Sequence, residues 1–397
     1  MTSLKQYFNS CTLYILLWIL YSLQGVLYEG GSIISQALLA IILLISVFFF
    51  FKVNIGESKL PSFLKVLNLF IVMMTIYGFL AIFGIDKLVT GEWVEVSRIE
   101  ALKTLYMSLL PIYVMYYYTS RQVLTEQTIR AISIVLIVST IFIFYKSYQE
   151  SLARALAEGS SNDEFTNNTS YNFLQLLPLL FFWRKKPIIQ ILLTATMFTF
   201  IVLGLKRGAM AIGAVCLLWF FYQALRQTKG WSRLLVIVIL CVGIYVGVNK
   251  LTEFYNTSDY FQQRIEQTMA GDSSGRDVIF DKLWSHFQSE TSFVRQLLGN
   301  GSYATIKIAG NYAHNDWLEL LICQGLLGVV VYVFYFLSLA KNIYQMRDNS
   351  VVYGVLIMTF IIMFASTLFS MSYNNLKLSI AISLGYSLSI LQKDAVH

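Results

Sequence analysis

The sequence predicts an all-α polytopic membrane protein with about twelve spanning helices. Of its 397 residues, 57% are hydrophobic and only 13% are charged, whereas about 25% of the residues of an ordinary soluble domain are charged. The apolar residues form blocks of about 17 to 24 residues, the length that an α-helix needs to cross the hydrocarbon core. The alternating pattern of barrel strands is absent, so helices must satisfy the backbone hydrogen bonds.

The apolar blocks place the spanning helices in order. The first block lacks a small-residue cleavage site after it, so we interpret it as a helix and not as a signal peptide. The sixth block is short and contains Pro178, which a membrane helix accommodates when its neighbours satisfy the freed carbonyl group. The predicted spans are residues 11–28, 33–51, 63–84, 101–119, 128–148, 171–183, 187–205, 208–225, 233–249, 317–340, 351–370 and 374–391.

Lysine and arginine set the predicted orientation. One set of loops holds basic runs such as Arg184-Lys185-Lys186, whereas short loops on the other side carry the acidic stretches 86–100 and 150–164. The positive-inside rule then places both termini in the cytoplasm. Three regions follow: residues 1–249 with nine spans, an external loop at 250–316, and residues 317–397 with three spans.

The charge and cysteine patterns exclude other classes. The net charge is +7, but the basic residues lie in short loops and form no stripe, so we predict no nucleic-acid partner. The four cysteines lie inside apolar blocks and form no metal-binding motif, which indicates small hydrophobic residues of the core.

Three polar segments outside the membrane are predicted to be helical. Residues 85–100 and 149–165 mix apolar and charged residues, which is typical of short interfacial helices. In the external loop, apolar residues recur at helical spacing from Arg276 to Leu298. This pattern predicts one amphipathic helix that lies on the bundle or at the bilayer surface.

Lys206 and Arg207 form a cationic pair between two apolar blocks on the predicted external side. Their position departs from the positive-inside bias, and it coincides with the start of a helix. Backbone N–H groups, the helix dipole and a guanidinium group can converge there on one anion. The alternative is a pair of loop charges that extend to the membrane interface.

Arg276 follows a Ser274-Gly275 turn and begins the predicted amphipathic helix. A first-turn arginine is suited to binding phosphate, but this signal is weak by itself. A solvated arginine beside Asp277 or Asp281, in a simple capping turn, explains the same residues.

His314 is the one histidine predicted at the external mouth of the bundle, followed by Asn315, Asp316 and, at the start of the tenth span, Glu319. A histidine titrates near neutral pH and can take a proton from an acceptor hydroxyl. A carboxylate just inside the membrane has a high free-energy cost, so Glu319 needs a hydrogen-bonding or charged partner. The alternative is an interfacial histidine that bonds a carbonyl group, with Asn315 or Asp316 capping the helix.

These motifs share an order and a side of the membrane. The motif Lys206-Arg207-Gly208 opens one span, and Ser274-Gly275-Arg276 lies in the long external loop. They are followed by the turn Leu298-Gly299-Asn300-Gly301 and then by Ala313-His314-Asn315, with Gly325 and Gly328 further on. Together they resemble the O-antigen ligase and Wzy-type polysaccharide polymerase superfamily of lipopolysaccharide biosynthesis. The motifs cover residues 204–328, and the first half of the chain has none.

The resemblance implies a GT-C-like, metal-independent glycosyltransferase without a cofactor in the bacterial cytoplasmic (inner) membrane, with its active site at the periplasmic face. Its donor would be a glycan linked to undecaprenyl diphosphate. Arg207, Arg276 and Lys206 would bind the donor diphosphate. His314 would act as general base on the acceptor hydroxyl or help to orient the donor, and Asn315, Asp316 and Glu319 would support the site. The acceptor would be a lipid-linked repeat unit or lipid A core, and a chain-length regulator is a further expected partner. Arginines in place of a metal agree with the sequence, because no DxD-like carboxylate pair is evident.

Two activities remain open, because a polymerase and a ligase differ only in the acceptor. We favour the polymerase, since tyrosines and acids in the external loops suit a sugar-rich acceptor. A transporter for a lipid-linked glycan would also use external arginines, but it would place further ionisable groups at mid-membrane and show broken helices in matching halves. The sequence shows neither.

Overall fold

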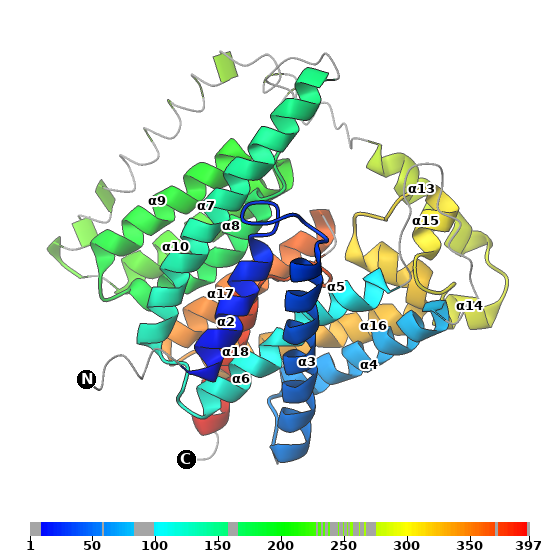
Figure 1. The fold of residues 1–397 in the computed structure, drawn as a ribbon, viewed down its shortest axis with the longest axis horizontal. Helices are drawn as coiled ribbons and strands as arrows, with labels where there is room; N and C mark the ends of the chain where they lie inside the picture. Colours follow the sequence, from blue (N-terminus) through cyan, green and yellow to red (C-terminus); the bar gives the residue numbers. More distant parts are fainter. Residues whose placement is uncertain are drawn as a thin grey trace.

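The computed structural model describes residues 9–57, 59–82, 99–157, 166–227, 275–369 and 372–394, with scattered positions between 229 and 266. In these parts every regular element is a helix, and one isolated bridge joins Gln24 to Tyr28. The helices (Figure 1) are α2 Ser10–Ser22, α3 Ile33–Gly56, α4 Ser62–Ile82, α5 Glu100–Leu109, α6 Pro111–Ser120, α7 Glu126–Ala157, α8 Ser170–Leu176, the 3-10 helix η1 Leu177–Trp183, α9 Pro187–Leu203, α10 Arg207–Gln227, α13 Arg276–Ser289, α14 Phe293–Leu298, α15 Ala304–Ala309, α16 Asp316–Gln345, α17 Ser350–Phe369 and α18 Leu378–Asp394.

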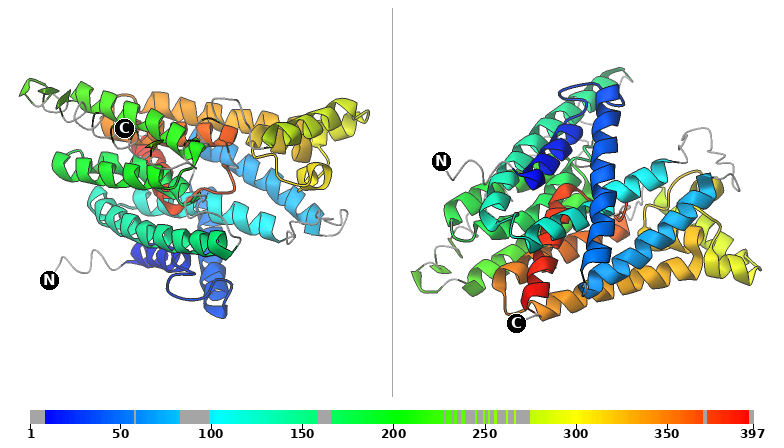
Figure 2. Two further views of the ribbon diagram at one scale, coloured as in Figure 1. Left: turned by 90° about the horizontal axis from the view of Figure 1, so that it is seen from above. Right: turned by 60° about the horizontal axis from the view of Figure 1, so that its bottom comes forward.

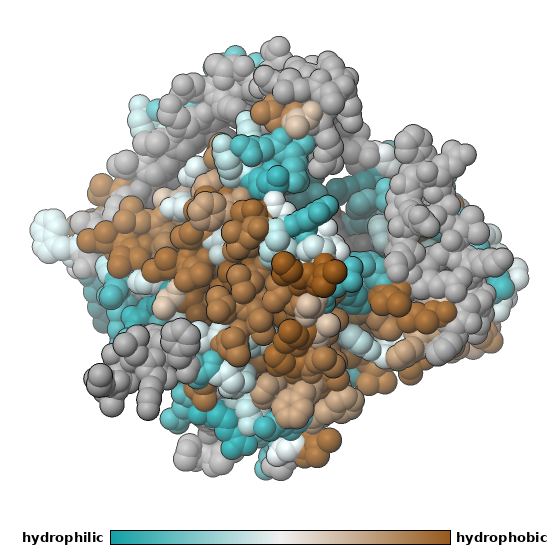
Figure 3. Space-filling view, in the orientation of Figure 1, coloured by the Kyte–Doolittle hydropathy of each residue, from teal (hydrophilic) through white to brown (hydrophobic). Residues whose placement is uncertain are grey.

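Six described helices are long and apolar enough to cross a membrane: α3, α4, α7, α10, α16 and α17. Helix α3 shows why water is an unsuitable solvent for them, because Ile33 and Ile55 are 85% and 83% exposed. Figure 3 shows a continuous apolar face in brown across the middle of the molecule. The all-helical membrane class is therefore confirmed, whereas twelve spans remain a prediction, since most of 233–249 lies outside the described residues.

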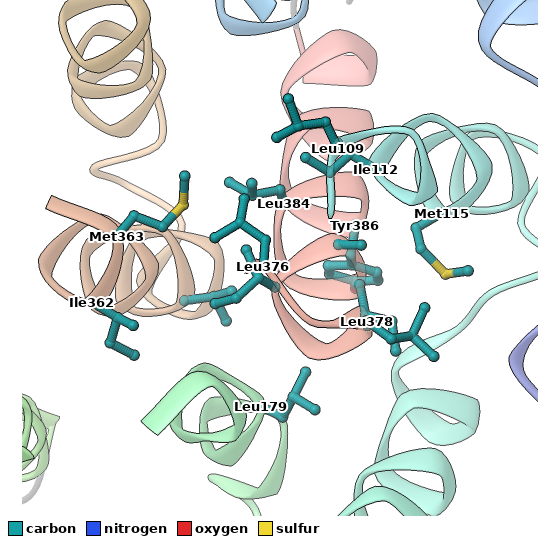
Figure 4. Close-up of a cluster of buried hydrophobic side chains, with 14 of the residues drawn as sticks. Leu109, Ile112, Met115, Leu179, Ile362, Met363, Leu376, Leu378, Leu384 and Tyr386 are labelled. Carbon is teal, nitrogen blue, oxygen red and sulfur yellow. The ribbon is translucent and has the colours of Figure 1, made fainter. Parts of the chain in front are cut away.

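Helix α18 lies at the centre of the bundle, against α6, α17 and η1 (Figure 4). Its face toward α6 is built from small residues, and a Cβ atom at Gly385 would come within 2.6 Å of the Tyr116 backbone nitrogen. Helices in lipid associate by such close packing, because apolar burial gives no driving force between them. Leu109, Ile112 and Leu384 fill the surrounding core.

The structure corrects three predicted elements. The fourth span, 101–119, is divided into α5 and α6 where Pro111 occupies the first position of α6. The predicted interfacial helix 149–165 continues α7 up to Ala157, and its remainder, like most of 85–100, lies outside the described residues. The amphipathic helix is two helices, because residues 290–292 leave the helical conformation between α13 and α14.

Helices α13, α14 and α15 form a small external unit beside the first half of α16, drawn in yellow in Figure 1 and seen from two other sides in Figure 2. Helix α16 is not continuous, since Gly325 has φ 67° and ψ −162°. The interruption frees the carbonyl groups of Ile322 and Cys323, which accept the backbone N–H groups of Asn300 and Gly301 at 2.9 Å each. In the membrane, freed carbonyl groups require such partners.

Candidate active site

The turn between α9 and α10 is shaped by two glycines and a left-handed leucine. Gly204 has no space for a side chain because Ser170 lies against it, and Gly208 likewise adjoins the Tyr171 hydroxyl group. Leu205 has φ 51°, which reverses the chain after α9. The carbonyl group of Gly204 accepts the Asn167 N–H at 2.8 Å and ties the turn to the start of α8. Helix α10 therefore begins at Arg207, as the sequence predicts, with Lys206 directly before it.

Arg276 begins α13, and the preceding Gly275 has φ 77°. Its Nη1 donates a hydrogen bond of 3.0 Å to the carbonyl oxygen of Phe369, the last residue of α17. Phe369 also adjoins the α10 terminus, since a Cβ atom at Gly208 would lie 3.1 Å from the Phe369 Cβ. Phe369 thus joins the first turns of α10 and α13, and the two arginine motifs meet at the C-terminal end of α17.

His314 stands in the turn before α16 with φ 52°. The next residue, Asn315, caps α16 and accepts the N–H groups of Trp317 and Leu318 at 2.9 and 3.1 Å. The pKa of His314 is lowered from its ordinary value, first by burial and then by the positive charges of Arg276 and Lys206. These electrostatic contributions bring the three sequence motifs together at one site. A lowered pKa keeps the imidazole neutral at pH 7, the form that can accept a proton.

Asp316 and Glu319 are buried and hydrogen-bonded. Asp316 accepts the Ser372 N–H at 2.9 Å and the Tyr332 hydroxyl at 2.6 Å, which ties α16 to the segment that precedes α18. Glu319 accepts the Thr305 hydroxyl at 2.7 Å and the Ala313 N–H at 2.9 Å. The partner that Glu319 needs is therefore the chain around His314. Both side chains hold the backbone of the site in place. This arrangement suits a supporting role for Asp316 and Glu319 better than the role of general base in place of His314.

Backbone conformations near the site are unusual. Four described non-glycine residues have positive φ, and three of them, Leu205, Tyr303 and His314, lie in segments next to the site. Such conformations cost of order 1–3 kcal/mol each and are found most often at functional sites. The fourth, Gln122, follows α6.

Three contributors were not predicted from the sequence. The Phe369 carbonyl group carries no sequence signal, because it takes its role from contact between helices far apart in the chain. The contact between Tyr171 and Gly208 could not be predicted for the same reason, although Tyr171 begins a predicted span. Asn167 did offer a signal, because an asparagine next to an apolar block is suited to binding backbone groups.

The described residues contain no group of three or more His, Cys, Asp or Glu side chains that could hold a metal ion. The positive charges that act on His314 are those of Arg276 and Lys206. Arg207 follows Lys206 as the first residue of α10. Cations of this kind suit an anionic group such as a diphosphate.

Comparison with known proteins agrees with the motif pattern. Residues 192–333 match a family model described as O-Antigen ligase. This part of the chain is similar to the O-antigen ligase family. The O-antigen ligase domain begins within α9 and ends within α16, so it contains Arg207, Arg276 and His314. The resemblance inferred from the motifs is therefore confirmed. No curated protein matches the chain.

The O-antigen ligase domain also contains both halves of the α16 interruption. Gly299 and Gly325 lie back to back, and a Cβ atom at Gly325 would come within 2.5 Å of the Gly299 nitrogen. The glycine motif Leu298-Gly299-Asn300-Gly301 therefore has a structural basis in this fold. This motif holds in place the first half of α16, which begins two residues after His314.

Proposed function

We propose that this protein is a membrane glycosyltransferase that polymerises undecaprenyl-diphosphate-linked repeat units into O-antigen or a related surface polysaccharide. The observation that carries the proposal is that Arg276 bonds the last residue of α17 and acts, with Lys206, on His314, whose pKa is lowered by burial and by these two positive charges. A lipid diphosphate is a leaving group that needs cations, and an acceptor hydroxyl needs a base. One site offers both.

The step that we propose is a glycosyl transfer without a metal ion. His314 takes the proton of the acceptor hydroxyl while its oxygen forms a bond to the anomeric carbon of the donor. The bond between that carbon and the diphosphate oxygen breaks, and the electron pair leaves with undecaprenyl diphosphate. Arg207 and Arg276, with Lys206, stabilise the charge that develops on the diphosphate. Planar guanidinium groups can bind two of its oxygen atoms at once.

The polymerase is preferred because tyrosine hydroxyl groups border the site. Tyr303 and Tyr312 line a small hollow together with Glu319, and such groups suit a sugar acceptor. A ligase that transfers the glycan to lipid A core is the second candidate, and the similarity of residues 192–333 to O-antigen ligases favours it. In both cases the site faces the periplasm of a bacterial inner membrane, and a chain-length regulator is a partner that we expect for the polymerase.

The glycan profile of a deletion strain tests the proposal and separates the two activities. We expect lipid A core that carries a single repeat unit, because a lost polymerase leaves the ligase of the cell intact. Long polymer that accumulates on the carrier lipid would assign the chain as a ligase. A wild-type profile would overturn both.

A further inference from the structure

A second hollow lies on the other side of the segment that precedes α18. It is a cavity of about 570 Å³ between α2, α5, α7, α8 and residues 374–379, within the range of roughly 300–1,000 Å³ that is typical of ligand sites. Its walls include Trp18, Tyr21, Glu100, Asn172 and Lys377. None of the motif residues of the sequence lines it. Figure 3 shows hydrophilic residues in a recess beside the apolar face of the molecule.

One short segment separates this cavity from the candidate active site. Ser372 donates its N–H to Asp316, two residues after His314. Asn374 lines both the large cavity and the hollow beside Tyr303. Residues 372–377 are therefore a shared wall, with Asp316 and the hollow beside Tyr303 on one face and the cavity on the other.

Three polar groups of the cavity lack partners within the described chain. The Asn374 Oδ1 and Ser379 Oγ atoms are buried without a hydrogen bond in the described part of the protein. Lys377 donates its backbone N–H to Gln175 at 2.7 Å, but among the described residues its ammonium group has no hydrogen bond or ion pair. Lys103, in contrast, is paired with Glu100. Buried polar groups in native proteins are almost always hydrogen-bonded, to protein, water or ligand, so these groups are available to water or to a bound ligand.

The chemistry of the lining selects the class of that partner. Amide, hydroxyl and ammonium groups beside the rings of Trp18 and Tyr21 match a ligand that carries many hydroxyl groups and also apolar faces. A sugar chain has both, whereas a lipid tail leaves the polar groups without partners. The charge of Lys377 also suits an acidic substituent on a sugar.

We propose that this cavity binds the acceptor glycan of the transfer reaction, with Lys377 and Asn374 forming hydrogen bonds to its sugar rings. The inference rests on the proposed function and extends it, because it assigns the acceptor to the half of the chain that has no motif. The acceptor hydroxyl then reaches His314 past residues 372–377. The donor diphosphate remains with Arg207 and Arg276.

Two substitutions in purified protein in lipid nanodiscs test the cavity. Lys377→Met removes the ammonium group, and Ser108→Trp fills the space from α5. Transfer is measured with lipid-linked repeat units extracted from cells that lack this chain, and binding is measured separately with undecaprenyl diphosphate that carries no sugar. We expect both variants to bind undecaprenyl diphosphate as the wild type does, but to need a substrate concentration at least about tenfold higher for half-maximal transfer, as the loss of a charged hydrogen bond predicts.

Matched controls make the outcome specific. Lys282→Met removes an exposed charge on α13, and Thr199→Trp adds a tryptophan at an exposed position on α9. Both control variants should transfer glycan normally. Lys377→Arg keeps the positive charge and should retain most of the activity. Wild-type transfer by both Lys377→Met and Ser108→Trp would overturn the cavity proposal, as would an equal loss in the controls. A wild-type protein that neither transfers glycan nor binds undecaprenyl diphosphate would instead overturn the proposed function.

Discussion

His314 combines a left-handed backbone, with φ 52°, and a lowered pKa. Its proposed role as a general base predicts a large loss of activity and a small loss of stability on substitution. We expect His314→Asn to fold normally, because asparagine tolerates positive φ. Transfer should fall by a factor of about a hundred to ten thousand, the usual contribution of a positioned acid–base group. The measurements are thermal unfolding and the transfer rate of the purified protein.

His314→Gln and His286→Gln complete that test. Glutamine forms hydrogen bonds but does not titrate, so recovery of most activity in His314→Gln would assign His314 to substrate orientation. His286 lies in the last turn of α13, and its substitution should leave transfer unchanged. A His314→Asn variant that fails to fold would mean that the histidine serves the structure.

The positive charges near His314 predict a specific pH dependence. Because the pKa of His314 is lowered from its ordinary value of 6.5, the neutral base dominates at pH 7. Activity should therefore fall only when the pH is reduced to the lowered pKa. Lys206→Gln removes one of the charges that lower the pKa, so the pKa should rise and the acid limb of the rate profile should move to higher pH. Lys282→Gln should leave the limb in place. A limb that stays or moves to lower pH in Lys206→Gln would contradict the proposed electrostatic coupling.

Arg276→Lys tests recognition of the diphosphate. Lysine keeps the charge but loses the planar fork that binds two oxygen atoms, so affinity for undecaprenyl diphosphate should fall roughly ten- to a hundredfold. Arg207→Lys should behave similarly. The control is Arg295→Lys, because Arg295 on α14 is an exposed arginine paired with Glu290. Unchanged affinity in the Arg276 and Arg207 variants would return them to the interfacial and capping interpretations.

At the scale of residues, charge was the signal that the sequence offered. Arg207, Arg276 and His314 were predictable because polar groups at a hydrocarbon edge are costly and therefore informative. Phe369 and Lys377 were not, since a backbone carbonyl group is present at every residue and a lysine before a span looks like an ordinary interfacial charge. Their roles depend on contacts between segments distant in the chain.

At the scale of elements, the interruption of α16 was the feature that hydropathy concealed. Residues 316–345 form one apolar run in which Gly325 is an ordinary membrane residue by composition. The break depends on the turn at Gly299, whose neighbours bond the freed carbonyl groups. Hydropathy placed helices α9, α10 and α17 close to their observed ends for the opposite reason, because each is a simple apolar block with polar ends. The division of the external amphipathic helix into α13 and α14 was hidden in the same way, since its apolar spacing continues across the break.

Gly325→Ala should destabilise the protein through the backbone of this interruption. A Cβ atom there would lie 2.5 Å from both the Gly299 nitrogen and the Leu297 carbonyl oxygen. At φ 67° and ψ −162° the alanine would also occupy a region essentially restricted to glycine, at a further cost of about 1–3 kcal/mol. We expect a loss of at least about 2 kcal/mol, seen as a lower Tm and as lost transfer. Gly310→Ala is the control, because Gly310 also has a positive φ, of 77°, but nothing within 4 Å of the added atom; it should cost only about 1 kcal/mol. Equal costs for the two variants would mean that the close backbone packing is not what stabilises α16.

At the scale of the whole molecule, the site and the topology are linked through α10. Helix α10 has 21 residues, so it spans roughly 30 Å, the thickness of the hydrocarbon core. Arg207 stands at its first turn, and Lys229 follows its other end. Helix α13 lies on the side of Arg207, because Arg276 bonds Phe369 beside the α10 terminus. The positive-inside rule assigns that side to the periplasm and Lys229 to the cytoplasm.

Cysteine labelling in intact spheroplasts tests this arrangement. Lys282 on α13 and Lys229 after α10 are both exposed, so each can be replaced by cysteine without disturbing the core. A membrane-impermeant maleimide should label Lys282→Cys and should label Lys229→Cys only after the membrane is opened. The unmodified chain gives the background, and its described cysteines, Cys11, Cys216 and Cys323, are buried. Labelling of Lys229→Cys but not of Lys282→Cys in intact spheroplasts would place Arg207, Arg276 and His314 in the cytoplasm. A donor and an acceptor that meet at the periplasmic face would then be excluded, because α10 would carry the site to the opposite end of the bilayer.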